Sequence, residues 1–411
     1  MRELPRVVVT GLGVVSPLGT LPRFWEELRA GANGFVPIDW FDVGAAPPAT
    51  VARVRDWQPK DHIKPAALRR MDRFSQMVVG ACRMALADAR LELTPARAEE
   101  TGVVVGAAYG NLSETEAFLR GLIVKGPALA NPMLFPNLVL NAAAGYVAIE
   151  LGLRGPNFTV CRNETSGEAA VALAYDTIVC GHADVVVAGG GDEVSPVLFH
   201  VNKDLGTLSP GRRGAAGHEW SSPFDRDRNG MILGEGAAML VLEREEHARA
   251  RGAAPYAELA GYATCTVPSK PHLWPRPSAA APRVMAAQLR ALRGADEIDA
   301  IVSCANSTRD LDAFEAAHLA GLLGESAGRA LVTSVKGAVG EFGGSGALGT
   351  AVAALALRDG LLPPLAALQR PDPACTLRLA SAEVATLPMR AALVSGSARG
   401  GACTALLLRQ P

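Results

Sequence analysis

Residues 183–193 read ADVVVAGGGDE, an apolar run that ends in three glycines and two acids. Because the run is apolar on both of its faces, it is typical of a β-strand covered by helices on each side of its sheet. Ala-rich stretches of helical length alternate with such runs along the chain. This alternation predicts the α/β class. The predicted strands are 7–10, 103–106, 183–188, 238–242, 300–303, 331–334, 391–395 and 404–408, and the predicted helices are 66–90, 137–152, 165–181, 281–293, 312–323 and 344–358.

A weak internal repeat divides the chain into two halves. ADVVVAGGGDE, followed by EGAAMLVLE at 235–243, resembles RAALVSGSARGGACTALLL at 390–408. GVVVGAAYG at 102–110 resembles AIVSCANST at 300–308. In each half a strand ends at a turn of small residues that leads into a helix. We therefore expect two similar halves, 1–250 and 251–411.

Composition excludes several classes of function. The 411 residues are 49% hydrophobic and 20% charged, which is ample for a large core. The formal net charge of −1 offers no reason to expect a nucleic-acid partner. No apolar run reaches the roughly 18 residues that a bilayer-spanning helix needs, so no membrane association is expected. The start of the chain lacks the apolar core of a signal peptide, which favours the cytoplasm.

The cysteines and the first glycine-rich segment are also informative. Seven cysteines are scattered without a CxxC pair or a metal-ligand spacing, so we expect reduced thiols and no metal site. TGLGVVSPLG at 10–19 lacks the third glycine of the dinucleotide-binding pattern, and Pro17 stands where the phosphate-binding helix would begin. We therefore expect a plain strand and loop there, and no cofactor.

Five segments together carry a resemblance to a known family. Their order and spacing resemble the β-ketoacyl-acyl-carrier-protein synthases of the thiolase fold, from about residue 6 to 408. The resemblance implies a thiolase-like five-layered αβαβα architecture built from two similar halves. The segments are VVVTGLGVVSPLG (7–19), GLRGPNFTV (152–160), GHADVVVAGGGDEVSP (181–196), SPFDRDRNGMILGEGAAMLVLE (222–243) and TSVKGAVGEFGGSGAL (333–348).

The resemblance also locates the catalytic positions. Active members use a cysteine to hold the acyl chain and two histidines to stabilise the enolate formed when malonyl-carrier loses CO₂. The cysteine position, nine residues after the glycine of the Gly-Pro pair, is Glu164. The histidine positions are Cys304 and Glu341, while the lysine of the second histidine motif is kept as Lys336. The C-terminal turn, usually GFGG, reads ARGG at 398–401.

These replacements predict that the chain is not catalytic by itself. An acyl anhydride on Glu164 would be a poor acyl store, and an anion at Glu341 would oppose enolate charge. Instead, Glu164 is expected to meet the free N–H groups at the start of the following helix, which contributes roughly 0.3–2 kcal/mol. Lys336 could pair with either Glu164 or Glu341. Cys161 is expected to be a buried thiol rather than a shifted nucleophile.

The pattern as a whole resembles a chain-length-factor, the ketosynthase-β subunit of a type II polyketide synthase. This implies a heterodimer with an active ketosynthase-α subunit, which condenses malonyl units on an acyl carrier protein while this chain shapes the tunnel. Usual members carry glutamine at the position of Glu164. NPMLFPNLVLN at 131–141 favours a polyene or other reduced product. The alternatives are an enzyme with altered chemistry (a malonyl-carrier decarboxylase or acyltransferase) and a stand-alone acyl-binding scaffold.

The stretch 111–126 is expected to lie at the dimer interface as a helix that begins near Ser113. Spacing puts Phe118 and Leu122 on one apolar face. With Leu134 and Leu138, these side chains would close the far end of the acyl tunnel, and ordinary core packing is the alternative. The residues expected at or near the subunit interface are Met133, Leu134, Phe135, Asn137 and Leu138.

Overall fold

A computed structural model describes residues 4–44, 47–211, 219–278, 280–380 and 384–411 of the protein. Its large sheet contains two sets of five strands with the same order. From the centre outward the first set is β1 (Val7–Ser16), β9 (Gly236–Arg244), β7 (Val185–Asp192), β5 (Thr101–Gly106) and β6 (Asn157–Val160). The second is β10 (Ala257–Thr266), β17 (Ala402–Arg409), β16 (Ala391–Ser397), β11 (Ile298–Val302) and β12 (Leu331–Thr333).

Strand direction repeats as well as strand order. In each set the three outer strands are parallel, and the two inner strands pair antiparallel. The sets join where β1 pairs antiparallel with β10, and β14 (Arg378–Leu379) extends the second set. The predicted α/β class and the two similar halves are thereby confirmed, whereas the boundary near residue 250 stays a prediction.

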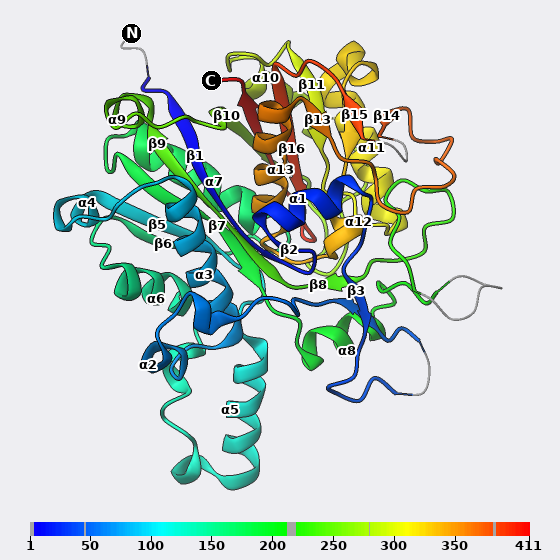
Figure 1. The fold of residues 1–411 in the computed structure, drawn as a ribbon. Helices are drawn as coiled ribbons and strands as arrows, with labels where there is room; N and C mark the ends of the chain where they lie inside the picture. Colours follow the sequence, from blue (N-terminus) through cyan, green and yellow to red (C-terminus); the bar gives the residue numbers. More distant parts are fainter. Residues whose placement is uncertain (1–3, 45–46, 212–218, 279, 381–383) are drawn as a thin grey trace.

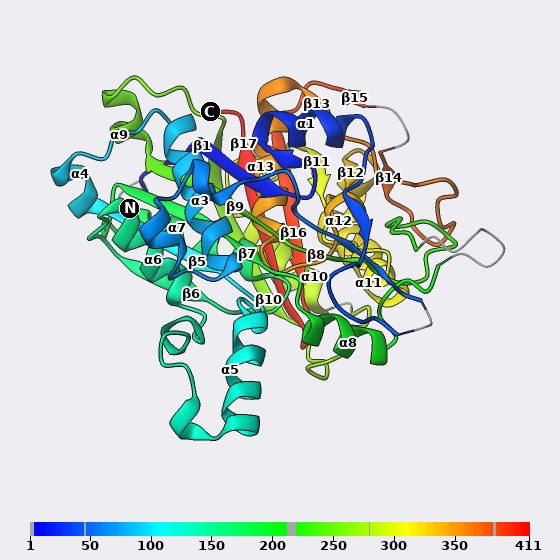
Figure 2. The ribbon, with the colours of Figure 1, turned by 60° about the horizontal axis from the view of Figure 1, so that its bottom comes forward.

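Helices cover the sheets in layers (Figures 1 and 2). One hydrophobic cluster joins the inner helices α7 (Ser166–Val179) and α13 (Ser345–Asp359) to strands of both sets. A second joins α3 (Arg73–Asp88) and α6 (Ala142–Leu151) to the outer face of the first set. A third joins α10 (Ala280–Leu289) and α11 (Arg309–Leu323) to that of the second. The result is the five-layered αβαβα fold.

Local sequence explains where several elements differ from prediction. The predicted helix 66–90 is two helices, α2 (Pro65–Leu68) and α3, because Asp72 caps α3 by accepting a hydrogen bond from the Ser75 amide at 2.7 Å. The predicted helix 137–152 begins only at Ala142, after a 3₁₀ turn. β10 was missed, although it joins the two halves.

The first glycine-rich segment serves packing. A side chain on Gly13 would meet the carbonyl oxygen of Ala81 in α3 at 1.9 Å, and one on Gly11 would meet that of Ala85 at 2.3 Å. Only glycine lets the strand and the helix approach this closely. Within the described ranges, none of the helices combines the length and hydropathy that a bilayer-spanning segment needs.

Short elements complete the described fold, and one helix stands apart from it. α5 (Leu112–Lys125) projects from the body together with the segment that returns from it (Figures 1 and 2). The short elements are α1 (Leu21–Arg29), α4 (Pro95–Glu100), α8 (Pro196–Asp204), α9 (Glu245–Ala250), α12 (Lys336–Val339), β2 (Gly19–Thr20), β3 (Phe35–Pro37), β4 (Thr50–Ala52), β8 (Leu233–Gly234), β13 (Leu361–Leu362) and β15 (Ala385–Thr386).

Candidate functional site

The positions identified from the sequence lie close enough to influence one another. Glu164 lies between β6 and α7, Cys304 follows β11, and Glu341 follows α12. Burial raises the pKa of Glu341, and the charge of Glu164 raises it further. Burial also raises the pKa of Cys304, an effect that the charge of Lys336, the ion-pair partner of Glu341, opposes. All three side chains are buried, with exposed fractions of 1%, 2% and 3%.

Glu164 is held by an arginine from the other half of the chain. Nε of Arg399, in the turn between β16 and β17, donates to Oε1 of Glu164 at 2.6 Å, and the Arg399 amide donates to Oε2 at 3.0 Å. The hydroxyl of Tyr109 donates to Oε1 at 3.0 Å. The remaining guanidinium nitrogens reach Asn202 Oδ1 at 3.0 Å and the Tyr109 oxygen at 2.7 Å. Every member of this cluster therefore has a partner.

Electrostatics favour the charged form of the Glu164–Arg399 pair. Burial is the largest single influence on Arg399 and lowers its pKa, but the charge and hydrogen bond of Glu164, with smaller contributions from Tyr109 and Glu341, together raise the pKa above its ordinary value. Burial and the same carboxylate raise the pKa of Tyr109, which stays a protonated donor. A buried charge is tolerated only when paired and hydrogen-bonded, and this arrangement meets that requirement.

The expectation that Glu164 binds the start of α7 is wrong. Thr165 is the N-cap of α7 and no side chain caps that end, while both Glu164 oxygens bind Arg399. A full positive charge at hydrogen-bonding distance outcompetes the partial charge of a helix end. Asn163 fixes this geometry, because its amide donates to the Arg399 carbonyl at 3.1 Å.

Lys336 pairs with Glu341 rather than with Glu164. Nζ lies 2.8 Å from Oε1 and 3.0 Å from Oε2 of Glu341, and Nδ2 of Asn306 donates to Oε2 at 2.7 Å. Burial is the largest single influence on Lys336 and lowers its pKa, but the charges of Glu341, Cys304 and Glu168 and the hydrogen bond to Glu341 together raise the pKa above its ordinary value, so the lysine stays protonated. Of the two partners that the sequence offered for Lys336, Glu341 is the one that binds it.

The thiols near the site are unsuited to nucleophilic chemistry. Burial raises the pKa of Cys304 well above its ordinary value, and the charge of Glu315 adds to this effect. A protonated thiol is a poor nucleophile and a weak hydrogen-bond donor. Cys161 is exposed, which contradicts the prediction of a buried thiol. It directly follows β6, an edge strand of the sheet that pairs only with β5 among the described strands and has no fully buried residue.

Glu168 is a buried acid that sequence reasoning missed. It lies one helical turn after Glu164 with an exposed fraction of 1%, and its Oε2 has no hydrogen-bond partner among the described residues. Burial raises its pKa to about 7, although the charge of Lys336 opposes the shift. Gly346 makes room for it, since a side chain there would meet the carboxyl carbon at 1.8 Å. In the sequence, an acid within an otherwise apolar first half of a predicted helix is the signal that could have identified this residue.

The charged groups of this site restrict the reactions that it could catalyse. Both cations, Arg399 and Lys336, are engaged by carboxylates, and Glu168 adds a third acid. Stabilising an enolate requires donors aimed at developing negative charge. At the positions that the sequence predicts for the family's histidines, the groups present are the Cys304 thiol and the Glu341 carboxylate, which pairs with Lys336. Among the described residues, no three histidine, cysteine or acidic side chains gather as a metal ion would require.

The predicted interface residues lie on the arm formed by residues 111–141. Met133 and Phe135 are 69% and 66% exposed, while Leu134 and Leu138 are half-buried. Asn137 differs, because it is 3% exposed and its amide donates to the Arg70 carbonyl at 2.9 Å. Its side chain is therefore bonded within its own chain.

Phe118 and Leu122 are half-buried on α5, which has no fully buried residue. The ring of Phe118 packs against that of Phe135, with centroids 6.1 Å apart. Within this chain the ring contacts the returning segment and belongs to none of the four buried clusters. Core packing and the tunnel role both stay predictions for this face.

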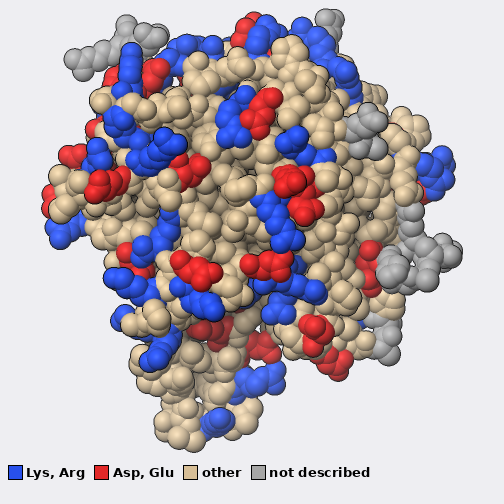
Figure 3. Space-filling view, in the orientation of Figure 1, with Lys and Arg blue, Asp and Glu red and all other residues tan. Residues whose placement is uncertain are grey.

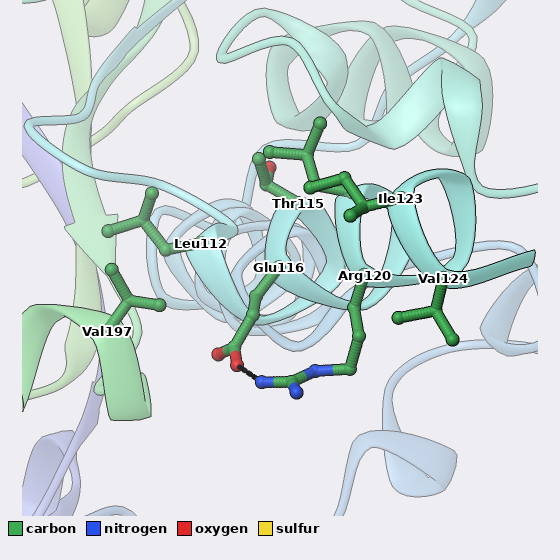
Figure 4. Close-up of a pocket in the computed structure, with 8 residues that line it drawn as sticks. Leu112, Thr115, Glu116, Arg120, Ile123, Val124 and Val197 are labelled. Carbon is green, nitrogen blue, oxygen red and sulfur yellow. Dashed lines mark hydrogen bonds and ion pairs between the residues drawn. The ribbon is translucent and has the colours of Figure 1, made fainter. Parts of the chain in front are cut away.

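The other side of α5 forms an open apolar groove of about 450 Å³ (Figure 4). Its charged residues, Glu116 and Arg120, form an ion pair of 2.7 Å, which leaves the groove with no net charge. In Figure 3 the tip of the arm carries few charged side chains, whereas the body of that face carries many of both signs. The groove is lined by Leu112, Thr115, Glu116, Leu119, Arg120, Ile123, Val124 and Val197.

Known proteins resemble this chain along its whole length. It is 32% identical to the 3-oxoacyl-[acyl-carrier-protein] synthase 2 of Coxiella burnetii over 99% of both chains. Its structure resembles the ishigamide ketosynthase/chain length factor, with a TM-score of 0.89 and 30% identity over 100% of both chains. It also resembles a type II polyketide ketosynthase solved with its acyl-carrier protein, with a TM-score of 0.88 and 26% identity over 100% of both chains.

Family models agree with these likenesses. The model described as the N-terminal domain of beta-ketoacyl synthase matches residues 5–248, and that of the C-terminal domain matches residues 256–369. Together they span more than half of the chain, including Glu164, Cys304 and Glu341. The chain belongs to the β-ketoacyl synthase family.

Proposed function

We propose that this chain is the non-catalytic chain-length-factor subunit of a type II polyketide synthase. It pairs with an active ketosynthase-α subunit, which carries out the decarboxylative condensation of malonyl units on an acyl carrier protein. The observation that carries the proposal is the Glu164–Arg399 ion pair, which fills the position of the family's nucleophile. The Lys336–Glu341 pair and the protonated Cys304 leave neither histidine function in place.

Two exposed features support a protein partner. β6 is an edge strand of the sheet, and Phe158 on it is 44% exposed. Unpaired strand edges readily pair with another chain, and large exposed apolar patches mark interaction sites. The arm presents such a patch, in which Ile123 is 80% and Val124 75% exposed. A partner that covers both features would resemble the assembly named by the ishigamide ketosynthase/chain length factor.

The arm also supplies the tunnel part of the proposal. Phe118 and Leu122 on α5, and Leu134 and Leu138 on the segment that returns from it, are half-buried and apolar, and the Phe118 ring packs against Phe135 of that segment. In a heterodimer these side chains would close the far end of the acyl tunnel, with Met133 and Phe135 at the subunit interface. We place the assembly in the cytoplasm and its product among polyenes or other reduced chains.

Co-expression with an active type II ketosynthase tests the proposal. Native mass measurement is expected to give a one-to-one heterodimer that extends malonyl-carrier, while this chain alone consumes none. Turnover of malonyl-carrier by the purified chain would instead favour altered chemistry. A stable homodimer that binds free acyl chains and ignores the ketosynthase would favour a stand-alone scaffold.

A further inference from the structure

Two cysteines face each other across a pair of neighbouring strands. In the antiparallel register of β10 and β17, Cys265 lies directly opposite Cys403. Opposed residues in such a pair have Cα atoms about 4.5–5.5 Å apart, within the range of roughly 4.4–6.8 Å that a disulfide spans. Both side chains pack against the same hydrophobic cluster, so they lie on one face of the sheet. No backbone movement is needed to bring the two sulfurs together.

The two thiols already interact and differ in reactivity. A hydrogen bond from Cys403 lowers the pKa of Cys265, and the charge of Arg162 lowers it further. The same bond, together with burial, raises the pKa of Cys403. Arg162 is held beside the pair by Thr264 Oγ1, at 3.2 Å from Nη1. Cys265 is half-buried near the end of β10, so it is the thiol that a small molecule can reach.

We propose that Cys265 and Cys403 are a thiol–disulfide exchange site for low-molecular-weight disulfides such as oxidised glutathione. The Cys265 thiolate attacks one sulfur of the oxidant, which forms a mixed disulfide and releases one small thiol. Cys403 then loses its proton and attacks Cys265, which forms the internal disulfide and releases the second small thiol. Two protein thiols are oxidised while one small disulfide is reduced, so atoms and electrons balance. Reduced small thiols reverse both steps.

A disulfide between Cys265 and Cys403 would constrain two segments that lie next to the Glu164–Arg399 pair. Val267, just after β10, donates its amide to the Gly401 carbonyl at 2.8 Å. The Gly400 amide donates to the Leu273 carbonyl at 3.2 Å, and the guanidinium of Arg399 lies 5.5 Å from the ring centre of Trp274. The disulfide would therefore join β10 and β17 covalently at the ends where residues 267–274 begin and the 398–401 turn ends. This inference does not depend on the proposed function.

Mass spectrometry of the full chain tests the site. The background carries Cys161→Ser and Cys180→Ser, because both of those thiols are exposed. After treatment with oxidised glutathione, alkylation and digestion, a peptide pair joined through Cys265 and Cys403 is expected, and it should disappear on reduction. Cys265→Ser should abolish the joined pair, whereas Cys375→Ser should leave it unchanged.

Two results would overturn the proposal. One is a persistent glutathione adduct on Cys265 with Cys403 still open to alkylation after denaturation. The other is full alkylation of both cysteines under conditions that completely modify Cys161 in the parent chain. Cys265→Ser is preferred over Cys403→Ser as the test variant because Cys403 is fully buried and its replacement could prevent folding.

Discussion

The carboxylate of Glu164 lies 2.6 Å from Nε of Arg399, although 235 positions separate the two residues in the sequence. Arg399 is 7% exposed and Glu164 1%, so each charge relies on the other. The position that the sequence predicts for the family's nucleophile therefore holds one partner of an ion pair, and the other partner comes from the turn between β16 and β17. The pair joins the two halves of the molecule.

Removing one partner of this pair should be costly. We expect Arg399→Met to lower the free energy of unfolding by about 3–5 kcal/mol, because it leaves Glu164 charged and buried without a cation. Arg154→Met is the matched control, since Arg154 is 73% exposed and pairs with Glu99 at 3.1 Å. Its cost should be at most about 1 kcal/mol. Chemical denaturation measures both, and equal costs would contradict the structural role of the pair.

Restoring a thiol at the nucleophile position should not restore catalysis. Glu164→Cys leaves Cys304 and Glu341 at the positions where the family uses histidine, so nothing stabilises the enolate. We expect no condensation product from malonyl-carrier when this variant is assayed without a ketosynthase. An active ketosynthase in the same assay is the positive control. Substantial product from the single substitution would show that our account of the enolate site is wrong.

Glu168 should make stability depend on pH. Burial raises its folded pKa to about 7 from an ordinary value of 4.5, so its stabilising contribution is present below about pH 4.5 and is lost as pH rises through about 7. Glu168→Gln keeps the neutral form at every pH. Relative to the wild type, the variant should gain up to about 3 kcal/mol between pH 5 and pH 8.

Denaturation series at several pH values measure this gain. Glu246→Gln is the control, because Glu246 is exposed and its replacement should change the free energy of unfolding by no more than about 0.5 kcal/mol. A difference between wild type and Glu168→Gln that is the same at pH 5 and pH 8 would mean that Glu168 does not titrate in this range.

Phe118→Ala should separate a tunnel role from a core role. Phe118 is half-buried against Phe135, so its loss should cost clearly less than the roughly 3–5 kcal/mol expected for a fully buried ring such as Phe314, which is 0% exposed. The reconstituted heterodimer carrying Phe118→Ala should make longer products, which chromatography with mass detection would reveal. Folded complex with unchanged product length would exclude Phe118 from the tunnel end.

A charge on the exposed side of the arm should weaken assembly. Ile123 is 80% exposed and lines the open groove of α5, so Ile123→Glu should raise the dissociation constant of the heterodimer at least about tenfold, or 1.4 kcal/mol. Val284→Glu is the control, because Val284 is also exposed but lies on α10 in the opposite half. Calorimetric titration against the ketosynthase measures the dissociation constants of both variants. Equal affinities would show that the arm is not part of the interface.

Sequence patterns sufficed for most of the fold. The runs at 183–193 and 391–408 are strands because their side chains are apolar on both faces, a property that neighbouring residues carry. β10 was not predicted because Gly261 interrupts it at a bulge and its residues form neither a continuous apolar run nor a regular alternation. Its strand conformation depends on pairing with β1 and β17, which no local pattern reports.

At the site, counting within the sequence motifs predicts by itself that Glu164, Cys304 and Glu341 stand at the positions of the family's cysteine and histidines. Only the tertiary structure decided which partners these side chains have. It placed Arg399 beside Glu164, paired Lys336 with Glu341 and left Ile123 and Phe135 exposed to solvent. The physical reason is the distance along the sequence over which each property is determined. Secondary structure reflects residues a few positions apart, whereas the partner of a buried charge is set by whichever distant segment the packed core places within hydrogen-bonding distance.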